Sequence, residues 1–261
     1  MKLTKIEHSE IELPSDIKAA LSGIPVYDSS SSPEARVYFV DTSVGYFIKT
    51  AKGGTLYKES VMNDYFSSLG YSKKTVYYKT REKDILITEK IRGKDLTSPE
   101  YLKEPRRLAE MLGRSLRALH ETPHKGCPIA DRTSDYLGAV DEGYAIGRFD
   151  PSYIDRSLCI TDAESAMRYI SLRRDILDTD TLLHGDYCLP NLIYRDFALS
   201  GYIDLGGAGV GDRHIDLFWG AWTLNFNLGT DEYRDVFFDA YGRDLIDRER
   251  LLFVSVAEAF G

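Results

Sequence analysis

The chain has 261 residues, of which 43% are hydrophobic and 28% charged, and its net charge at pH 7 is −8. These values are ordinary for a globular protein, and the length suffices for one large domain or two small ones. The acidic balance argues against a nucleic-acid binder, which usually carries a basic patch. It is compatible with simple solubility or with a cationic substrate.

The cysteines and the apolar runs exclude several other classes of protein. Cys127, Cys159 and Cys188 are widely spaced and form no Cys-x-x-Cys motif, which argues against a disulfide framework or a zinc site and predicts a cytoplasmic protein. No apolar run approaches the roughly 18 residues of a membrane helix, and the acidic residues near the N-terminus are untypical of a signal peptide. We therefore expect a monomer or weak dimer without membrane or nucleic-acid partners.

Residues 1–91 are predicted to form a small antiparallel sheet with one helix, preceded by a short helix at 15–21. Strands are predicted at 35–40, 45–50, 75–79 and 84–89 from alternating or β-rich runs between turns. Apolar residues recur at helical spacing over 56–69, which predicts the helix of this domain. Lys49 lies near the end of the second strand, and Glu59 lies in the helix.

A change of composition at 91–96 marks the predicted boundary, after which the chain is mainly helical. Helices are predicted at 104–120, 161–177, 215–228, 233–241 and 247–260. Thr161-Asp162-Ala163-Glu164 is typical of a capping box at the start of the second of these. Residues 121–160, with scattered Gly, Pro and Asp, are the hardest to assign. The elements together predict an α+β fold with domains at 1–91 and 92–261.

One compound motif carries the chemistry. It consists of His184-Gly185-Asp186, then Asn191 five residues after the aspartate, then a short hairpin that leads to Asp204-Leu205-Gly206. A lone aspartate is common in turns, but this spacing is what metal-assisted phosphoryl transfer needs. Asp186 would face the attacking hydroxyl as the catalytic base, while Asn191 and Asp204 would hold Mg²⁺ on the nucleotide phosphates.

Residues of the first domain complete a kinase-like scheme. In that scheme a lysine at the end of a strand contacts the α- and β-phosphates of a nucleotide, and a glutamate on the next helix orients the lysine. Lys49 and Glu59 are therefore assigned to nucleotide binding. Phe47 shares a sheet face with Lys49 and is a candidate to lie against the adenine ring. The backbone near Ser32 is a candidate to contact the β-phosphate.

These motifs resemble those of the aminoglycoside 3′-phosphotransferases, a branch of the kinase-like fold, over about Ser32 to Phe260. The resemblance implies a bilobal protein-kinase-like fold with a small antiparallel N-lobe at 1–91 and a mainly helical C-lobe at 92–261. Thr88, Glu89 and Ile91 fall at the hinge of the family, which implies that they bind the nucleotide, ATP or GTP. The resemblance also implies that Asp216 braces the catalytic loop.

The resemblance further implies a cationic aminoglycoside as the substrate. Family members place acids over the sugar amines before the catalytic loop, which makes Asp150 and Asp155 candidates, and the tail residues Glu258 and Phe260 correspond to the acceptor site. The chain departs from the family at Gly207, where an arginine is common. It departs also at Ala257 and at Gly261, which extends the chain past the terminal phenylalanine.

The short connection after Gly206 distinguishes this chain from a protein kinase. Only about eight residues precede the helix near Ile215, too few for an activation segment. We therefore predict Mg²⁺-dependent transfer of the ATP γ-phosphate to the 3′-hydroxyl of an aminoglycoside, conferring antibiotic resistance. The alternatives are a kinase of another small alcohol or amino sugar (choline-like, sugar-like or another antibiotic) and a non-catalytic nucleotide-binding module with a kinase fold.

Overall fold

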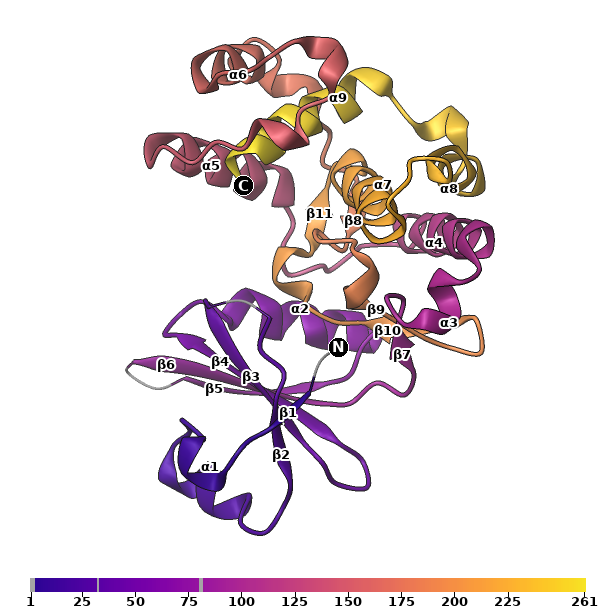
Figure 1. Cartoon of the computed structure of the whole chain (residues 1–261). Coiled ribbons are helices and arrows are strands. Elements are labelled where there is room, and N and C mark those ends of the chain that lie inside the picture. The colour runs from indigo at the N-terminus through magenta and orange to yellow at the C-terminus, as the bar shows by residue number, and fades with distance from the viewer. Residues whose placement is uncertain (1–2, 32, 80–81) are drawn as a thin grey trace. The chain divides into compact units, whose positions relative to one another are not determined.

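The structure is a computed structural model that describes residues 3–31, 33–79 and 82–261. The chain packs as two compact units, each described separately below and traced by colour in Figure 1. Unit 1 comprises Met1–Asp95 and Leu192–Gly206, and unit 2 comprises Leu96–Asn191 and Gly207–Gly261. The boundary expected at residue 91 lies near the first limit, but the sequence did not indicate that 192–206 returns to unit 1.

Unit 1 is built on an antiparallel sheet (Figure 1). In the described part of the chain its strands are, in spatial order, β1 (Thr4–Lys5), β2 (Val26–Asp28), β3 (Ala35–Val40), β4 (Tyr46–Lys52), β6 (Lys83–Glu89) and β5 (Thr75–Lys79). Its helices are the 3₁₀ turn η1 (His8–Glu10), α1 (Ser15–Ala20) and α2 (Tyr57–Ser68). The four longer strands and both α-helices confirm the prediction. β1 and β2 are too short for side-chain alternation to show in the sequence.

The two faces of this sheet differ: one packs in an apolar cluster and the other carries Lys49. Ile48 and its neighbours Tyr38 and Ile85 are buried in an apolar cluster to which α1 contributes Ile17. Because side chains alternate along a strand, Lys49 points to the opposite face. That face meets α2, since Lys49 reaches Glu59 there.

A second sheet of unit 1 is formed late in the chain. Its strands, in spatial order, are β10 (Ala198–Tyr202), β9 (Leu192–Arg195) and β7 (Lys94–Asp95). The two hairpin residues Asp196 and Phe197 both have positive φ, as a tight two-residue hairpin turn requires. Ser72 anchors the hairpin by donating its hydroxyl to the Tyr202 carbonyl at 3.1 Å. The segment that ends at Asp204 is thereby fixed in unit 1.

Unit 2 is mainly helical (Figure 1). Its α-helices in the structure are α3 (Pro99–Leu102), α4 (Pro105–His120), α5 (Arg132–Ala145), α6 (Ala163–Ser171), α7 (His214–Leu228), α8 (Arg234–Tyr241) and α9 (Arg248–Ala257). Strands β8 (Thr181–Leu183) and β11 (Gly209–Gly211) pair with each other. Short 3₁₀ turns are η2 (Pro151–Tyr153), η3 (Arg156–Leu158), η4 (Arg174–Ile176), η5 (Leu189–Asn191), η7 (Arg243–Leu245) and η8 (Glu258–Phe260), and η6 (Leu205–Gly207) lies where the chain re-enters unit 2.

Three expectations for the helical part need correction. The helix expected over 161–177 ends at Ser171, and its N-cap is Asp162, which accepts the Ser165 N–H, rather than a box begun by Thr161. The helix expected over 247–260 ends at Ala257 and continues as the turn η8. Helix α5 was missed because Gly138 and Gly143 interrupt its apolar pattern.

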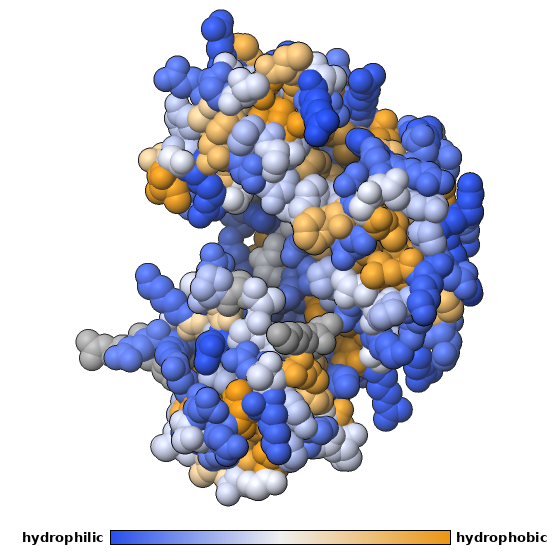
Figure 2. Space-filling model, viewed as in Figure 1, coloured by the Kyte–Doolittle hydropathy of each residue, from blue (hydrophilic) through white to orange (hydrophobic). Residues whose placement is uncertain are grey.

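The core of unit 2 gathers around the C-terminal segment. Helices α5, α6 and α9 pack on or beside it, while α4, α7 and α8 pack together (Figure 1). Phe253 and Phe260 are completely buried in this core. Figure 2 shows that hydrophilic residues cover most of the face in view, with apolar residues in scattered groups. Among the described residues no helix is long and apolar enough to cross a membrane.

The two glycines of α5 offer a matched test of this packing. A Cβ at position 143 would lie 2.0 Å from the Phe260 carbonyl oxygen, whereas one at 138 would meet nothing within 4 Å. Gly143→Ala should therefore lower the free energy of unfolding by about 1–3 kcal/mol through overpacking. Gly138→Ala should raise it by up to about 1 kcal/mol through helix propensity. Chemical denaturation measures both, and equal stabilities of the two variants would contradict the close approach of the C-terminal segment to α5.

Candidate active site

The catalytic motif lies in unit 2, in a loop between β8 and η5. Gly185 has φ +82°, and a Cβ there would lie 1.8 Å from the Gly207 carbonyl oxygen. Both the left-handed backbone and the close approach require glycine. This explains why the residue before Asp186 carries no side chain.

Asp216 holds this loop from the first turn of α7. Its buried carboxylate accepts the backbone N–H groups of His184 and Gly185, each at 2.7 Å. A buried carboxylate is stable only when it is fully hydrogen-bonded, and these bonds fix two consecutive peptide groups. The bracing role that the family resemblance implied for Asp216 is thus confirmed.

His120, at the end of α4, is a third partner of the same carboxylate. Its Nε2 lies 3.2 Å from Asp216 Oδ2 and its Nδ1 lies 2.9 Å from the Tyr241 hydroxyl. Burial lowers the pKa of His120, although Asp216 acts in the opposite direction. No local sequence pattern indicates this contact, because the partners are 96 residues apart.

The carboxylate of Asp186 is oriented by its own loop. Asn191 Nδ2 donates to Asp186 Oδ2 at 2.8 Å and to the Asp186 carbonyl at 3.1 Å. The Asp186 N–H lies 3.3 Å from His184 Nδ1, which agrees with a scaffold role for this histidine. Asp186 is partly exposed, as a group that meets a substrate must be. Since Nδ2 of Asn191 is occupied by Asp186, the Asn191 oxygen is the atom left to face a cation.

The second half of the predicted chemistry lies in unit 1. Lys49 Nζ is 2.8 Å from Glu59 Oε2 and 2.7 Å from Asp204 Oδ1. Burial by itself would lower the pKa of Lys49, but the Asp204 and Glu59 carboxylates outweigh it and raise that pKa, so the ammonium stays charged. Asp204 has φ +58°, a left-handed conformation that is uncommon outside glycine, and its carboxylate is about half exposed.

The other proposed nucleotide residues occupy different places in unit 1. Phe47 and Thr88 are register partners on the face that carries Lys49, and the Phe47 ring lies 5.1 Å from that of Phe39. Glu89 is exposed at the end of β6.

The last two nucleotide-binding candidates are Ile91 and Ser32. Ile91 is buried, and its Cδ1 would lie 3.0 Å from a Cβ at Gly201. Its side chain therefore packs on the hairpin. Ser32 lies outside the described residues.

The two acids proposed from the segment before the catalytic loop cap 3₁₀ turns. Asp150 Oδ1 accepts the Ser152 N–H and Asp155 Oδ1 accepts the Ser157 N–H, each at 2.9 Å. Hydrogen bonding from the Ser152 and Ser157 hydroxyls, followed by that from these N–H groups, holds the pKa of each carboxyl below its usual value. Both side chains therefore stay anionic and fixed in place, with Asp150 exposed.

The two tail residues proposed for the acceptor are buried. Glu258 is 7% exposed, and its Oε1 accepts the Tyr136 hydroxyl at 2.9 Å and Trp219 Nε1–H at 3.0 Å. Burial raises the pKa of Glu258 to about 7. The Phe260 ring is fully buried beside Tyr144, so its side chain anchors the tail in the core instead of facing a ligand.

Arg132 is a residue of this region that the sequence did not reveal. It extends from the first turn of α5, and its Nε donates to the Gly207 carbonyl at 2.7 Å. Gly207 is the position at which the family resemblance leads one to expect an arginine. A guanidinium therefore lies beside this position although residue 207 itself carries no side chain. The two residues are 75 positions apart, so no local pattern could indicate the contact.

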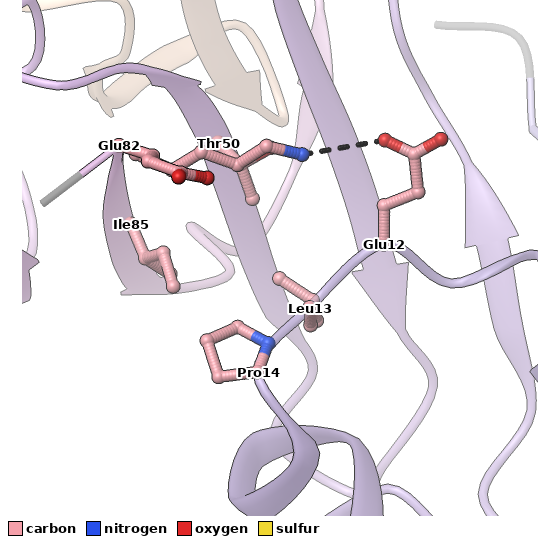
Figure 3. Close-up of a pocket in the computed structure, with 7 residues that line it drawn as sticks. Glu12, Leu13, Pro14, Thr50, Glu82 and Ile85 are labelled. Atoms are coloured by element: carbon pink, nitrogen blue, oxygen red, sulfur yellow. Dashed lines mark hydrogen bonds and ion pairs between the residues drawn. The ribbon is translucent and has the colours of Figure 1, made fainter. Parts of the chain in front are cut away.

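A cavity of about 320 Å³ lies in unit 1, away from the Lys49 face of the sheet (Figure 3). Its lining residues are Glu12, Leu13, Pro14, Thr50, Glu82, Lys83 and Ile85. Lys83 and Glu12 form an ion pair at 3.3 Å across it. Thr50 follows Lys49 on β4 and so points to the other face, which separates this cavity from the nucleotide-binding candidates.

Comparison with known proteins gives a consistent set of likenesses. The phosphotransferase enzyme family matches residues 31–253. A probable aminoglycoside 3′-phosphotransferase of Lactococcus lactis is 46% identical over 254 residues, which cover 96% of this chain and 95% of the relative. An aminoglycoside 3′-phosphotransferase of Niallia circulans is 32% identical over 64% of each chain.

Solved structures resemble the whole fold. The crystal structure of an aminoglycoside-3′-phosphotransferase of type VIII matches with a TM-score of 0.74 and 23% identity, over 94% of this chain and 97% of that one. An aminoglycoside phosphotransferase of Streptomyces rimosus matches with a TM-score of 0.75 and 18% identity, over 94% of each chain. At these identities the likeness shows the fold, and it confirms the protein-kinase-like α+β class expected from the sequence.

The raised pKa of Glu258 predicts a pH-dependent stability. Its ordinary value is 4.5 and its folded value about 7, so between these values the folded state binds a proton that the unfolded state has lost. Stability contributed by this group is therefore present at low pH and falls as the pH rises through that window, by about 3 kcal/mol in all. Glu258→Gln stays neutral and keeps an oxygen for Tyr136 and Trp219. The melting temperature of this variant, relative to that of the wild type, should therefore rise as the pH increases from 5 to 8.

Glu249→Gln is the control, since it removes an exposed carboxylate from helix α9. Its melting temperature should keep the same offset from the wild type at both pH values. If the offset of Glu258→Gln is also the same at both pH values, the pKa of Glu258 is not raised in the folded state.

Proposed function

Because this chain belongs to the phosphotransferase enzyme family, we propose that it transfers the γ-phosphate of ATP to the 3′-hydroxyl of an aminoglycoside antibiotic and so confers resistance. The observation that carries the proposal is the Asp186 carboxylate, oriented by Asn191 in a loop that Asp216 braces. The names of the relatives support the acceptor class. We expect the reaction in the cytoplasm, where ATP is available, and a monomer or weak dimer as the active form.

Asp186 is proposed as the base that receives the proton of the attacking hydroxyl. Phosphoryl transfer demands little covalent chemistry from the protein, so positioning and charge compensation supply most of the catalysis. The hydrogen bonds from Asn191 restrict the Asp186 carboxylate to one orientation.

In unit 1, Lys49 is proposed to bind the α- and β-phosphates, with Glu59 as its positioning partner. The ammonium already lies between two carboxylates, which supports a site built for a dense array of charges. Phe47 and Thr88, on the same face, would border the adenine, and the backbone at Glu89 and Ile91 would pair with it. Whether the donor is ATP or GTP depends on this last contact.

The residues proposed for Mg²⁺ fit a hard cation. Asn191 and Asp204 offer amide and carboxylate oxygens, the donors that Mg²⁺ prefers, and Asp204 has one oxygen beyond the one paired with Lys49. The described residues hold no group of three or more His, Cys, Asp or Glu side chains suited to a metal. This agrees with an ion bound mainly through the nucleotide phosphates, whose charge it would neutralise. Asp204 and Asn191 belong to different units, and their shared role rests on the family pattern.

For the acceptor, charge is the proposed basis of recognition. Asp150 and Asp155 supply fixed carboxylates in unit 2, while Glu258 would act through the position it gives to the tail. An aminoglycoside is polycationic, so these carboxylates complement it.

Turnover with defined acceptors tests the proposed function. The purified protein, given Mg²⁺-ATP, should release ADP with kanamycin and other aminoglycosides that carry a 3′-hydroxyl, and not with analogues that lack it. Release of ADP only with a choline-like or simple sugar alcohol would show that the enzyme acts on another class of acceptor. Tight ATP binding without turnover of any hydroxylated amine would contradict the proposal that this protein is an enzyme.

Replacement of the proposed base gives a second test. Asp186→Asn should lower kcat with kanamycin by about 10²–10⁴-fold, the usual contribution of a general base, while the Kd for ADP stays nearly unchanged. Asp196→Asn is the matched control. That aspartate is exposed in the hairpin turn with φ +53°, a conformation that asparagine tolerates, so full activity is expected. An Asp186→Asn enzyme that keeps more than half of the wild-type kcat would show that Asp186 is not the base.

A further inference from the structure

An aromatic cluster in unit 2 is not used by the chemistry described so far. It joins Tyr153 of η2 to Trp219 and Trp222 of α7. The ring centroids lie 5.8 Å apart for Tyr153–Trp219, 6.0 Å for Tyr153–Trp222 and 5.3 Å for Trp219–Trp222. Each of the three side chains is only partly buried. They therefore present ring surface to solvent, which core aromatics do not.

Helix α7 links this cluster to the catalytic loop. Asp216, one turn before Trp219, accepts the His184 and Gly185 N–H groups. Thr223, directly after Trp222, accepts the Leu189 N–H at 3.2 Å with its hydroxyl. The two tryptophans thus stand on a stretch of helix that is hydrogen-bonded to the loop on both sides of Asp186. A molecule that contacts them would therefore lie against the same helix that positions the loop of Asp186.

Carboxylates flank the aromatic rings. Trp219 Nε1 donates to Glu258 at 3.0 Å. Asp150 caps the same 3₁₀ turn that carries Tyr153, and burial, followed by the charges of Asp150 and Glu258, raises the pKa of Tyr153. Asp186 in turn raises the pKa of Glu258, after burial as the main cause. The rings therefore lie in a region of negative potential that includes the catalytic carboxylate.

The chemistry of this surface selects a definite kind of ligand. The face of a tryptophan ring attracts an ammonium group, and does so more strongly than that of other aromatic residues. The same face packs against the C–H face of a saturated ring, while the neighbouring carboxylates attract cations. A saturated ring that bears ammonium and hydroxyl groups satisfies all of these features at once.

We propose that Tyr153, Trp219 and Trp222 form an aromatic wall of the acceptor site, against which a ring of the amino-sugar acceptor stacks. This inference rests on the proposed function, because it assigns part of the acceptor site of that reaction. The wall gives affinity that charge alone does not, and it orients the ring so that a hydroxyl meets Asp186. It determines specificity and takes no part in the proton transfer.

The composition of the chain makes the wall directly observable. The sequence contains two tryptophans, and both stand in the wall. Intrinsic tryptophan fluorescence therefore reports on this surface alone. Titration with kanamycin should change the emission with a midpoint equal to the Kd measured by calorimetry. Emission that stays constant while calorimetry shows saturation would overturn the wall.

Substitution separates stacking from folding. Trp222→Ala should raise KM and Kd for kanamycin by about 10-fold, the equivalent of one cation–π contact, with kcat within about twofold. Trp222→Phe keeps an aromatic face and should recover most of the affinity. The control is Leu172→Ala, which removes an apolar side chain that is 73% exposed at the end of α6, so its KM for kanamycin should equal that of the wild type. Circular dichroism and melting temperatures show that each variant is folded.

The outcomes distinguish this inference from the proposed function. If the wild type phosphorylates no aminoglycoside, the proposed function fails, and the wall fails with it as an acceptor site. If the wild type phosphorylates kanamycin but Trp222→Ala keeps the wild-type KM, only the wall is overturned. If Trp222→Phe binds as weakly as Trp222→Ala, the aromatic face is not what holds the acceptor, which also overturns it.

Discussion

The buried carboxylate of Asp216 is the interaction on which the catalytic unit depends. It accepts hydrogen bonds from two consecutive peptide groups of the catalytic loop and contacts His120 at the end of α4. A carboxylate removed from water is stable only with such partners, so the loop, α4 and α7 determine one another's positions. The left-handed backbone of Gly185, the residue before Asp186, is maintained by this network, because its N–H is one of the bonded groups.

The pKa values of Lys49 and Glu258 also depend on the groups that surround each of them. Lys49 lies between Glu59 and Asp204, so its ammonium remains charged in spite of burial. Glu258 shows the opposite case, in which desolvation outweighs two hydrogen bonds and the pKa rises to about 7. The first arrangement suits the binding of phosphates, and the second ties the chain end to α5 and α7. Carboxylates of one sequence thus acquire different roles from their surroundings.

The sequence predicted local features well and long-range contacts poorly. The alternation in β3 and β4 and the spacing from Asp186 to Asp204 are local patterns, and they indicated the candidate residues of both units. The pairing of Arg132 with Gly207 and of His120 with Asp216 joins residues that no periodicity relates. Helix α5 was missed because Gly138 and Gly143 interrupt its apolar pattern; Gly143 serves the close approach of Phe260, whereas Gly138 faces open space. The acceptor role expected for Phe260 came from the family resemblance, and its complete burial depends on tail packing that no local pattern shows.

The return of 192–206 to unit 1 has a consequence for synthesis of the chain. Strand β7 pairs with β9, which is translated about a hundred residues later. A ribosome that has released the first 95 residues has therefore delivered an incomplete unit, without the hairpin that Ser72 anchors and without Asp204. Unit 1 matures only after most of unit 2 has also emerged, so the two units become complete at nearly the same moment. A fragment cut at Asp95 would lack an essential part of its own fold.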